Sequence, residues 1–366
     1  MGMHISTETI FFSLFIIFIL GILFFDLKVI GRHSHVIGFK EAMSWTIVWV
    51  SLAIVFYLFL LFYGDLIHGL RNLDDLEVLK AHITKYKHAI RITDDMSIAQ
   101  ALGKYRSNMA LEYITGYLIE YSLSVDNVFV MLMIFLSFGI NKKYYKKVLF
   151  WGILGAIIMR FVFIFVSAAL IAKFGWILYI FGGFLVVTGV IMFLNRNKEE
   201  KIDPHHHPVV RFTSRYFLVY PRQVGERFYI RKGGLFYLTP LMLVLLVIEF
   251  TDVVFAVDSV PAIFAVTKDP YIVFFSNIFA ILGLRSLFFL LMNFMTRFHY
   301  LKHGLAFLLV FIGLKMLLHH PLEAIGFKTI HSLIIIVLIL GTSIVLSVLI
   351  KKDQENSPAG SGPAKP

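Results

Sequence analysis

The sequence predicts an all-α protein, a polytopic transmembrane helical bundle with about nine spans. Hydrophobic residues make up 58% of the chain and charged residues 16%, and a mean hydropathy of +0.81 is too high for a domain with a solvated surface. Several apolar runs also reach roughly 20 residues, enough for a helix to cross a hydrocarbon core of about 30 Å. The expected spans cover residues 8–28, 44–66, 113–138, 147–171, 174–194, 238–266, 271–295, 303–319 and 329–350.

The first two spans form an N-terminal unit over residues 1–66, with an N-out/C-in topology for the whole chain. No basic residue precedes the first span, whereas Lys28 and Arg32 follow it; this pattern is typical of an uncleaved helix rather than a signal peptide. Segments expected inside carry about twice as many Lys and Arg residues as those expected outside, as the positive-inside rule requires. The net charge of +11 is therefore a topology signal, and no nucleic acid is expected as a partner.

The polar segments are expected to be loops. Residues 67–110 are predicted to form an outside loop with a short amphipathic helix, and 195–235 a basic cytoplasmic loop suited to contact with anionic membrane lipid. For His205, His206 and His207 in that basic loop, a solvated role is favoured over metal sensing. After a last helix in 321–350, the small, polar tail 351–366 is expected to be disordered. The chain has no cysteine, which excludes disulfides, thiolate metal sites and thiol redox chemistry by its own side chains.

Residues 111–194 and 236–320 are expected to be two repeats of three helices each. An acid, a second acid six residues later and a polar residue directly after it occur in both. Because three helices is an odd number, the second unit enters the membrane from the opposite side. Such a three-plus-three inverted repeat is typical of secondary transporters, whose substrate site lies near the midplane, although a duplication without a transport role would leave the same pattern. The matched positions are Glu120 with Asp252, Asp126 with Asp258, Asn127 with Ser259, and Arg160 with Arg285.

Carboxylates in these spans are the candidate functional groups, because a charge at the bilayer centre costs about 2.5 to 3.5 kcal/mol on insertion scales. At about 100° per residue, Asp126 and Asp258 point roughly 120° away from the preceding acids. Pro261 is expected to break its helix and bring backbone carbonyls to the site. The expected metal ligands are Glu120, Asp126, Asn127, Glu249, Asp252, Asp258 and Ser259, with Arg160 and Arg285 as charge-pairing residues.

Oxygen ligands of this kind suit hard divalent cations such as Mn²⁺, Mg²⁺ or Ca²⁺. The five acids, weighed against the two arginines and Lys315, leave two negative charges, which one divalent ion or two protons would balance. The alternative is that the arginines and acids form structural ion pairs only. Met131, Met133 and Met242 could offer sulfur to a transition metal, although methionine in an apolar helix usually serves packing.

With these residues in view, the chain resembles the TerC family, and most closely its Alx branch. The resemblance covers nearly all of residues 1–350 and rests on TGYLIEYSLSVDNVFV, ILGAIIMR, LYIFGGFLVVTGV and TPLMLVLLVIEFTDVVFAVDSVPAIFAVTKDPYIVFFSNIFAILGLR. It implies a multi-pass protein of the bacterial inner membrane, related to the lysine exporter superfamily and associated with manganese export and tellurium resistance. The acids that it implicates in metal handling are Glu120, Asp126, Glu249, Asp252 and Asp258.

The expected function is export of divalent metal ions, most of all Mn²⁺, in exchange for protons through a midplane carboxylate site. A carboxylate cluster suits such exchange, because either a cation or protons can neutralise it. The metal is then the transported substrate, no cofactor is expected to be permanently bound, and no enzymatic activity is expected. The alternative is a membrane stress-response scaffold that supports metal loading of exported proteins with the protein-secretion machinery. An anion exporter would need arginines in excess of acids, which is the reverse of what the spans contain.

Overall fold

The computed structural model describes residues 7–29, 37–70, 76–86, 88, 90–195, 207–292 and 301–349. His205, His206 and the tail 351–366 lie outside these residues. Within the described part, the chain is an all-α polytopic bundle, as predicted, and eight of its helices are long and apolar enough to cross a membrane. The orientation and the inverted repeat stay predictions.

Each predicted span corresponds to one helix. Among these, α10 is apolar but has only 17 residues, in keeping with the short eighth span. The helices are α1 (Thr7–Val29), α2 (Phe39–Tyr63), α4 (Ile98–Ser137), α5 (Tyr145–Lys173), α6 (Ile177–Leu194), α8 (Pro240–Phe264), α9 (Pro270–Met292), α10 (Leu301–Leu317) and α12 (Thr329–Leu349). The shorter elements are the 3₁₀ turns η1 (Gly64–Leu66) and η2 (Lys142–Tyr144), the helices α3 (Leu76–Lys85), α7 (Pro208–Tyr216) and α11 (His319–Ala324), and the strands β1 (Leu218–Val219), β2 (Tyr229–Lys232) and β3 (Leu235–Leu238).

Helix α4 is much longer than the span predicted over 113–138. It begins at Ile98 behind a capping box, in which Ser97 accepts from the backbone of Gln100 and the Gln100 side chain accepts from the backbone of Ser97. Its 40 residues extend about 60 Å, twice the thickness of a hydrocarbon core. The first third of α4 therefore lies beyond the span, in the segment that was expected to be mostly loop.

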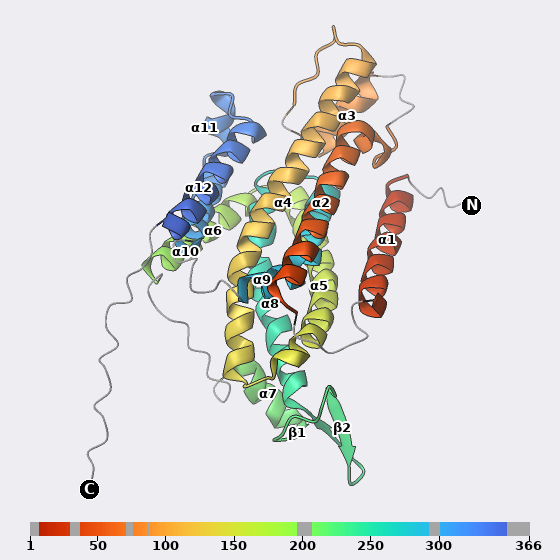
Figure 1. Ribbon diagram of the computed structural model, residues 1–366. Helices are drawn as coiled ribbons and strands as arrows, with labels where there is room; N and C mark the ends of the chain where they lie inside the picture. The colour runs from red at the N-terminus through yellow and green to blue at the C-terminus, as the bar shows by residue number, and fades with distance from the viewer. Residues whose placement is uncertain are drawn as a thin grey trace.

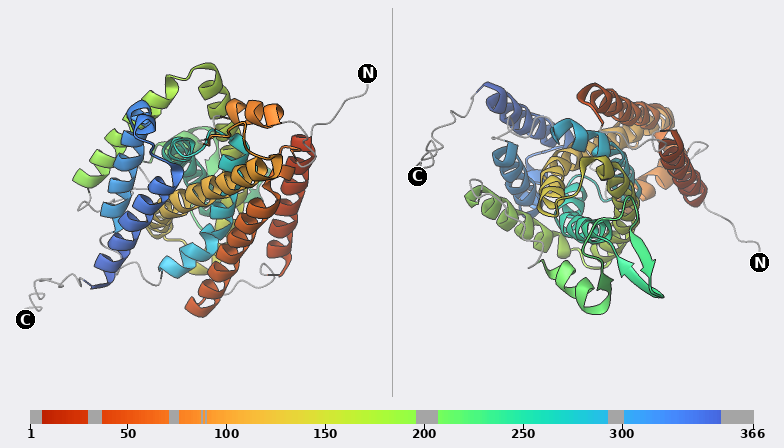
Figure 2. Two further views of the ribbon diagram at one scale, coloured as in Figure 1. Left: turned by 90° about the horizontal axis from the view of Figure 1, so that it is seen from above. Right: turned by 60° about the horizontal axis from the view of Figure 1, so that its bottom comes forward.

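Helices α4, α5, α8 and α9 form the middle of the molecule, with α6, α10 and α12 on one side and α1 and α2 on the other (Figures 1 and 2). Every residue from 272 to 289 of α9 is buried. Neighbouring helices therefore surround α9 along nearly its whole length, and its polar side chains face protein rather than lipid. This enclosed helix and its three central neighbours position the candidate site.

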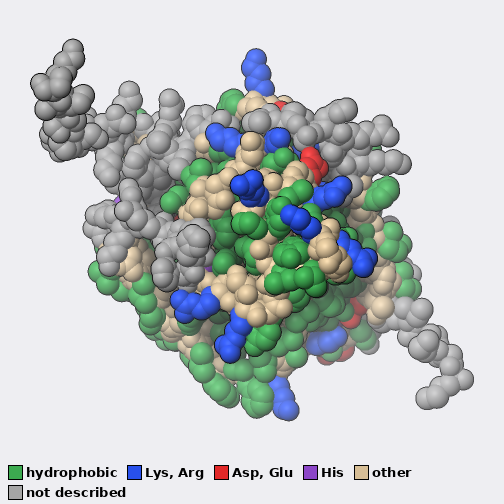
Figure 3. Space-filling model, turned by 90° about the horizontal axis from the view of Figure 1, so that it is seen from below, with side chains coloured by type: hydrophobic (Ala, Val, Ile, Leu, Met, Phe, Trp, Pro, Cys, Tyr) green, Lys and Arg blue, Asp and Glu red, His purple; other side chains and the backbone are tan. Residues whose placement is uncertain are grey.

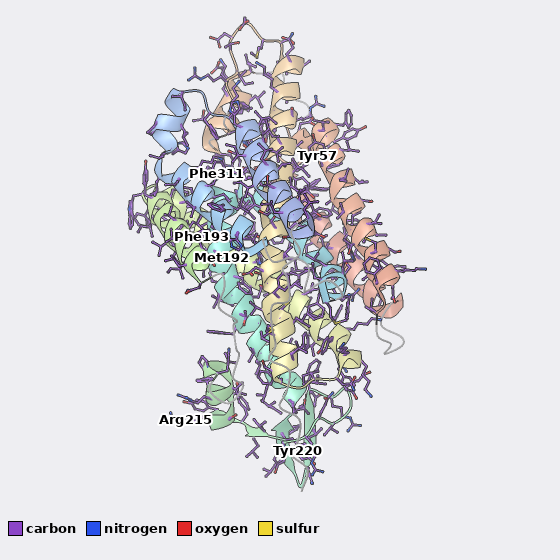
Figure 4. All side chains as sticks on the ribbon, turned by 60° about the vertical axis from the view of Figure 1, so that its left-hand side comes forward. Tyr57, Met192, Phe193, Arg215, Tyr220 and Phe311 are labelled. Carbon is purple, nitrogen blue, oxygen red and sulfur yellow. The ribbon has the colours of Figure 1, made fainter. Side chains whose placement is uncertain are left out.

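A three-stranded sheet lies where only a basic loop was predicted. Its strand order is β1-β3-β2, with β1 parallel and β2 antiparallel to β3. Gly233 and Gly234 join β2 to β3 with φ of +59° and +83°, the positive values that a two-residue type I′ turn requires. Many Lys and Arg side chains lie on the surface of the end of the molecule that carries the sheet (Figure 3). Arg215 and Tyr220 lie at this end, beyond the long helices (Figure 4). Its exposed basic residues include Arg211, Arg215, Arg222, Arg227, Arg231 and Lys232.

The opposite end, which we call the histidine end, is closed by an ion-pair relay. The buried His68, just after η1, holds Glu8 of α1 at 2.9 Å through Nδ1 and Asp269, the residue before α9, at 2.9 Å through Nε2. Burial by itself lowers the pKa of His68, but the charge of Asp269 and hydrogen bonds to Asp269 and Glu8 outweigh it and raise that pKa to about 9. A protonated His68 therefore ties the beginnings of α1 and α9 together.

Helices α6 and α10 touch through glycines. A Cβ added to Gly182 would lie 2.9 Å from Cβ of Met316, and one added to Gly313 would lie 2.6 Å from the carbonyl oxygen of Gly182. Such close backbone approach is how small residues bring helices together in membranes.

We expect Gly182→Leu to destabilise the protein by about 1–3 kcal/mol, because the added side chain overpacks this contact. The neighbouring Gly183, where a Cβ would meet nothing within 4 Å, provides the matched control Gly183→Leu. Thermal unfolding of the purified proteins in detergent would compare them. Equal midpoints for the two variants would contradict the glycine contact.

The His68 relay predicts a pH dependence of stability. Because the pKa of His68 is raised from 6.5 to about 9, its contribution is complete below pH 6.5 and is lost as pH rises through about 9. A shift of this size corresponds to a few kcal/mol, roughly 3. In the presence of chelator, we expect the stability of the wild-type protein to fall over this pH window. His68→Gln should be less stable than wild type at pH 7, and its stability should change less with pH. The exposed His331 provides the control His331→Gln, and parallel pH profiles for all three proteins would refute the relay.

Candidate functional site

The centre of the bundle contains a buried arginine surrounded by polar groups from four helices. Arg160 of α5 is 0% exposed, and its Nη1 donates to Oε1 of Glu120 in α4. The same nitrogen donates to Oγ of Ser259 in α8 at 3.0 Å and to Oδ1 of Asn277 in α9 at 3.0 Å. Nη2 lies 3.5 Å from Oδ1 of Asp252 in α8. Arg160 thus lies against two of the acids with which it was predicted to pair.

Asn277 completes this network and was not predicted. Its side-chain nitrogen donates to Oε2 of Glu120 at 3.2 Å, while its oxygen accepts from Arg160. Both carboxylate oxygens of Glu120 are therefore satisfied. The sequence does carry a signal for Asn277, since SNIFAILGLR places an amide in a largely apolar run. From α9 the residue that reaches Glu120 is Asn277, while Arg285 is buried two turns further along the helix.

Asp252 differs from Glu120, because only one of its oxygens has a protein partner. Oδ1 contacts Arg160, whereas Oδ2 is buried without a hydrogen bond to any part of the chain that the structure describes. Asp252 also lines a cavity of about 10 Å³, together with Met131 of α4 and aliphatic side chains of α5, α8 and α9. That volume is close to what a single water-sized species needs. A buried carboxylate oxygen without a partner, beside such a cavity, calls for a ligand.

Glu249 lies on the same face of α8, one turn before Asp252, and is half-buried. Its carboxylate rests against the backbone of α5 at Gly155, where a Cβ would lie only 2.1 Å from Oε1. Glycine at this position therefore allows Glu249 to approach. The charges of Glu249 and Asp252 influence one another, so a second carboxylate stands near the partnerless oxygen.

Asp126 and Asp258 form a separate pair. The Asp258 side chain forms a hydrogen bond with Thr188 of α6, and it interacts electrostatically with Asp126. Both acids are only partly buried. They face away from Arg160 because six residues turn a helix by about 240° net of whole turns. The predicted break at Pro261 was wrong, since α8 stays helical through this residue to Phe264. A proline in the last turn removes little hydrogen bonding, so no unwound segment turns these acids toward the centre.

The two remaining predicted ligands take different places. Ser259 belongs to the Arg160 network, whereas Asn127 is 3% exposed and its Nδ2 has no hydrogen-bond partner among the described residues. Glu120, Asn127 and Met131 fall on one face of α4 by helical spacing. Asn127 therefore lies on the side of α4 that carries both the Arg160 network and the cavity.

The charges around Asp252 do not cancel within this group. If all are ionised, Glu120, Glu249 and Asp252 carry three negative charges, and Arg160 supplies one positive charge. The excess of two negative charges in a buried setting favours a cation, because unpaired buried charge is costly. This group, Glu120, Arg160, Glu249, Asp252, Ser259 and Asn277, is called the Asp252 site below.

We expect Arg160→Leu to lower the free energy of unfolding by about 3–5 kcal/mol, because it leaves Glu120 and Asp252 buried without their cation. Arg160→Lys should cost less, since it keeps the charge but not the planar fork. Adding Glu120→Gln to Arg160→Leu should recover part of the loss. Denaturant unfolding of the purified proteins in detergent would measure these free energies of unfolding. Lys173→Leu, at the exposed end of α5, is the control. No recovery in the double variant would argue against the ion pair.

The Asp252 site lies within a region that matches a known family. The model of the family described as "Integral membrane protein TerC family" matches residues 105–355, which includes all residues of the site. No solved structure matches the chain.

Several bacterial proteins are similar to this chain over most of its length. An uncharacterized membrane protein of Myxococcus xanthus is 41% identical over 345 residues, covering 94% of each chain. A protein of Salmonella typhi named "Putative membrane-bound redox modulator Alx" is 40% identical over 336 residues, covering 90% of this chain and 92% of its own. The protein of the same name from Escherichia coli strain K12 is 41% identical over 319 residues, covering 86% and 88%. The chain is therefore an integral membrane protein that belongs to the TerC family, in its Alx branch.

Proposed function

We propose that this protein transports divalent metal cations, with Mn²⁺ as its exported substrate, and that the Asp252 site receives the ion. The observation that carries the proposal is Oδ2 of Asp252, a buried carboxylate oxygen without a partner in the described chain that lies beside a cavity. An ion approaching from the cavity would meet Oδ2 while Arg160 still holds Oδ1. The arginine would therefore stay in place when the metal binds.

The chemistry of the surrounding groups supports a cation such as Mn²⁺. Carboxylate and amide oxygens suit hard divalent ions. Met131 adds a thioether to the lining of the same cavity, a softer group that disfavours Mg²⁺ and Ca²⁺ relative to a transition metal. The Asp126–Asp258 pair, which lies beside Thr188, would be a second binding site for the same ion along its path.

Protons are the proposed counter-ions. When the metal leaves, the excess negative charge around Asp252 has to be neutralised again, and buried carboxylates accept protons readily for this purpose. Alternating access would then expose the site to one side with metal bound and to the other with protons bound. We place the protein in the inner membrane of a bacterium and propose transport without an enzymatic step or a resident cofactor.

A second candidate function is a membrane stress-response scaffold of the tellurium-resistance type, working with the secretion machinery. The name "redox modulator" given to the Salmonella and Escherichia relatives favours a role in stress. Thiol chemistry, however, would have to come from a partner, because this chain has no cysteine. In a scaffold the Arg160 network would serve only to hold α4, α5, α8 and α9 together.

We expect Asp252→Asn to reduce Mn²⁺ transport at least tenfold, because the amide keeps the shape but removes the formal charge that holds the ion. The assay is uptake of radioactive Mn²⁺ into inside-out membrane vesicles with an imposed proton gradient. Asp95→Asn, which changes an exposed carboxylate before α4, is the matched control and should behave as wild type. An uncoupler should stop uptake if protons drive it.

Two results would contradict this proposal in different ways. Wild-type uptake by Asp252→Asn, at equal membrane abundance, would remove Asp252 from the transport site. Absence of metal uptake by proteoliposomes that contain the purified wild-type protein, across a panel of divalent ions, would favour the scaffold.

A further inference from the structure

The histidine end holds a group of metal-ligating side chains that the transport proposal does not use. Glu8 comes from the first turn of α1, His68 from the segment after η1, and His82 from α3. One ligand atom from each of these residues lies within 4.8 Å of the other two. Three segments that are distant in sequence thus bring two imidazoles and a carboxylate together.

Neighbouring groups contact one or both nitrogens of each ring. Nε2 of His68 lies 2.9 Å from Oδ2 of Asp269, which turns Nδ1 toward Oε1 of Glu8, also at 2.9 Å. Nε2 of His82 lies 3.2 Å from the hydroxyl of Tyr105. If that nitrogen donates its hydrogen to Tyr105, Nδ1 of His82 keeps a free lone pair. Histidines that bind metals are typically fixed in this way through their other nitrogen, often by a carboxylate.

The carboxylate is positioned as well. The Tyr86 hydroxyl donates to Oε1 of Glu8 at 3.2 Å, and Lys85 lies 3.9 Å from the same oxygen. The Glu8 side chain is 21% exposed whereas that of His68 is fully buried. The group is therefore enclosed on one side and open to an arriving ion at Glu8.

We propose that Glu8, His68 and His82 form a second metal site, for a divalent transition-metal ion of the zinc class, at the histidine end of the bundle. Two imidazoles and one carboxylate are a recurrent ligand set for Zn²⁺, with a fourth position left to water. Imidazole nitrogens suit Zn²⁺, Cu²⁺, Fe²⁺ and Ni²⁺, in contrast to the oxygens of the Asp252 site. Binding replaces the hydrogen on Nδ1 of His68, and one proton leaves to solvent for each ion bound.

The geometry needs only a small adjustment. Ligand atoms in a tetrahedral site with bonds of about 2.1 Å lie about 3.4 Å apart. Because the present separations are within 4.8 Å, the widest of them would close by at most about 1.4 Å. The partly exposed side chains of Glu8 and His82 can make this movement by rotation, while His68 stays fixed by Asp269. The charges also favour the ion, since Glu8 and Asp269 both flank His68 and oppose the positive charge of Lys85.

This site is separate from the Asp252 site. Tyr105, which holds His82, precedes Glu120 on α4 by fifteen residues, or about 22 Å along the helix. An ion at the histidine end would fasten α1 and α3 to the beginning of α9 and replace the proton in the His68 relay. The concentration of metal would therefore set how firmly α1, α3 and the beginning of α9 are held together.

The test uses Co²⁺ as a spectroscopic probe on the purified full-length protein in detergent. A tetrahedral site with nitrogen ligands gives Co²⁺ a much stronger visible absorption than an octahedral site of oxygens. We expect wild type to develop this absorption at one equivalent of Co²⁺ and to lose it on addition of Zn²⁺. His82→Ala and Glu8→Ala should each weaken binding at this site roughly 10- to 100-fold or more, as loss of even supporting groups does at metal sites.

The controls separate this inference from the proposed function. His331→Ala removes an exposed histidine of α12 and should leave the absorption intact, as should Asp252→Asn. The inference fails if the wild-type protein gives only the weak octahedral spectrum, or if His82→Ala and Glu8→Ala titrate as wild type does. Because transport is not measured, neither result depends on whether the Asp252 site exports Mn²⁺.

Discussion

The buried ion pair between Arg160 and Glu120 is the constraint on which the rest of the bundle depends. A fully enclosed guanidinium is costly unless it is paired and hydrogen-bonded. Here α4, α8 and α9 supply partners to Nη1 and Nη2 of Arg160 in α5, whereas Nε has none among the described residues. Any large shift of one of these helices would leave a charge uncompensated. The same requirement uses only one oxygen of Asp252, a residue that lines a cavity, and the other oxygen has no hydrogen-bond partner among the described residues. The arrangement that pairs Arg160 thus also leaves an oxygen of Asp252 available to bind an ion.

Two groups of ion pairs in the described chain share the same arrangement. At the centre, Arg160 stands between Glu120 and Asp252, and at the histidine end, His68 stands between Glu8 and Asp269. Each cation joins carboxylates from different helices. The difference lies in what can replace it: arginine keeps its charge at any physiological pH, whereas the proton on histidine can be lost or exchanged for a metal ion. The positive charge at the centre is therefore fixed, whereas the positive charge on His68 can be removed or replaced.

Sequence reasoning recovered the features that depend on local pattern. The apolar runs predicted every long helix, and the cost of buried charge drew attention to Glu120, Asp252 and Arg160. Helical phase placed Asp126 about 120° from Glu120, yet Asp126 was still expected to join the same metal site, whereas the structure pairs it with Asp258. It missed contacts between distant segments, such as Asn277 with Glu120 and His68 with Asp269, because a polar residue near a span end gives no hint of its partner. Pro261 was misjudged because the position of a proline within its helix decides whether it breaks the helix. The Gly233–Gly234 turn was readable from sequence but was passed over inside a charged segment.

The most direct measurement is the position of Mn²⁺ in the protein, determined by anomalous diffraction at the manganese edge from crystals grown with saturating Mn²⁺. We expect a peak within about 2.5 Å of Oδ2 of Asp252, at the distance of a metal–oxygen bond, with Arg160 still holding Oδ1. We also expect Asp252→Asn crystals to lack that peak. Well-occupied manganese elsewhere in the molecule with none beside Asp252, or no bound manganese at saturation, would contradict the proposed site.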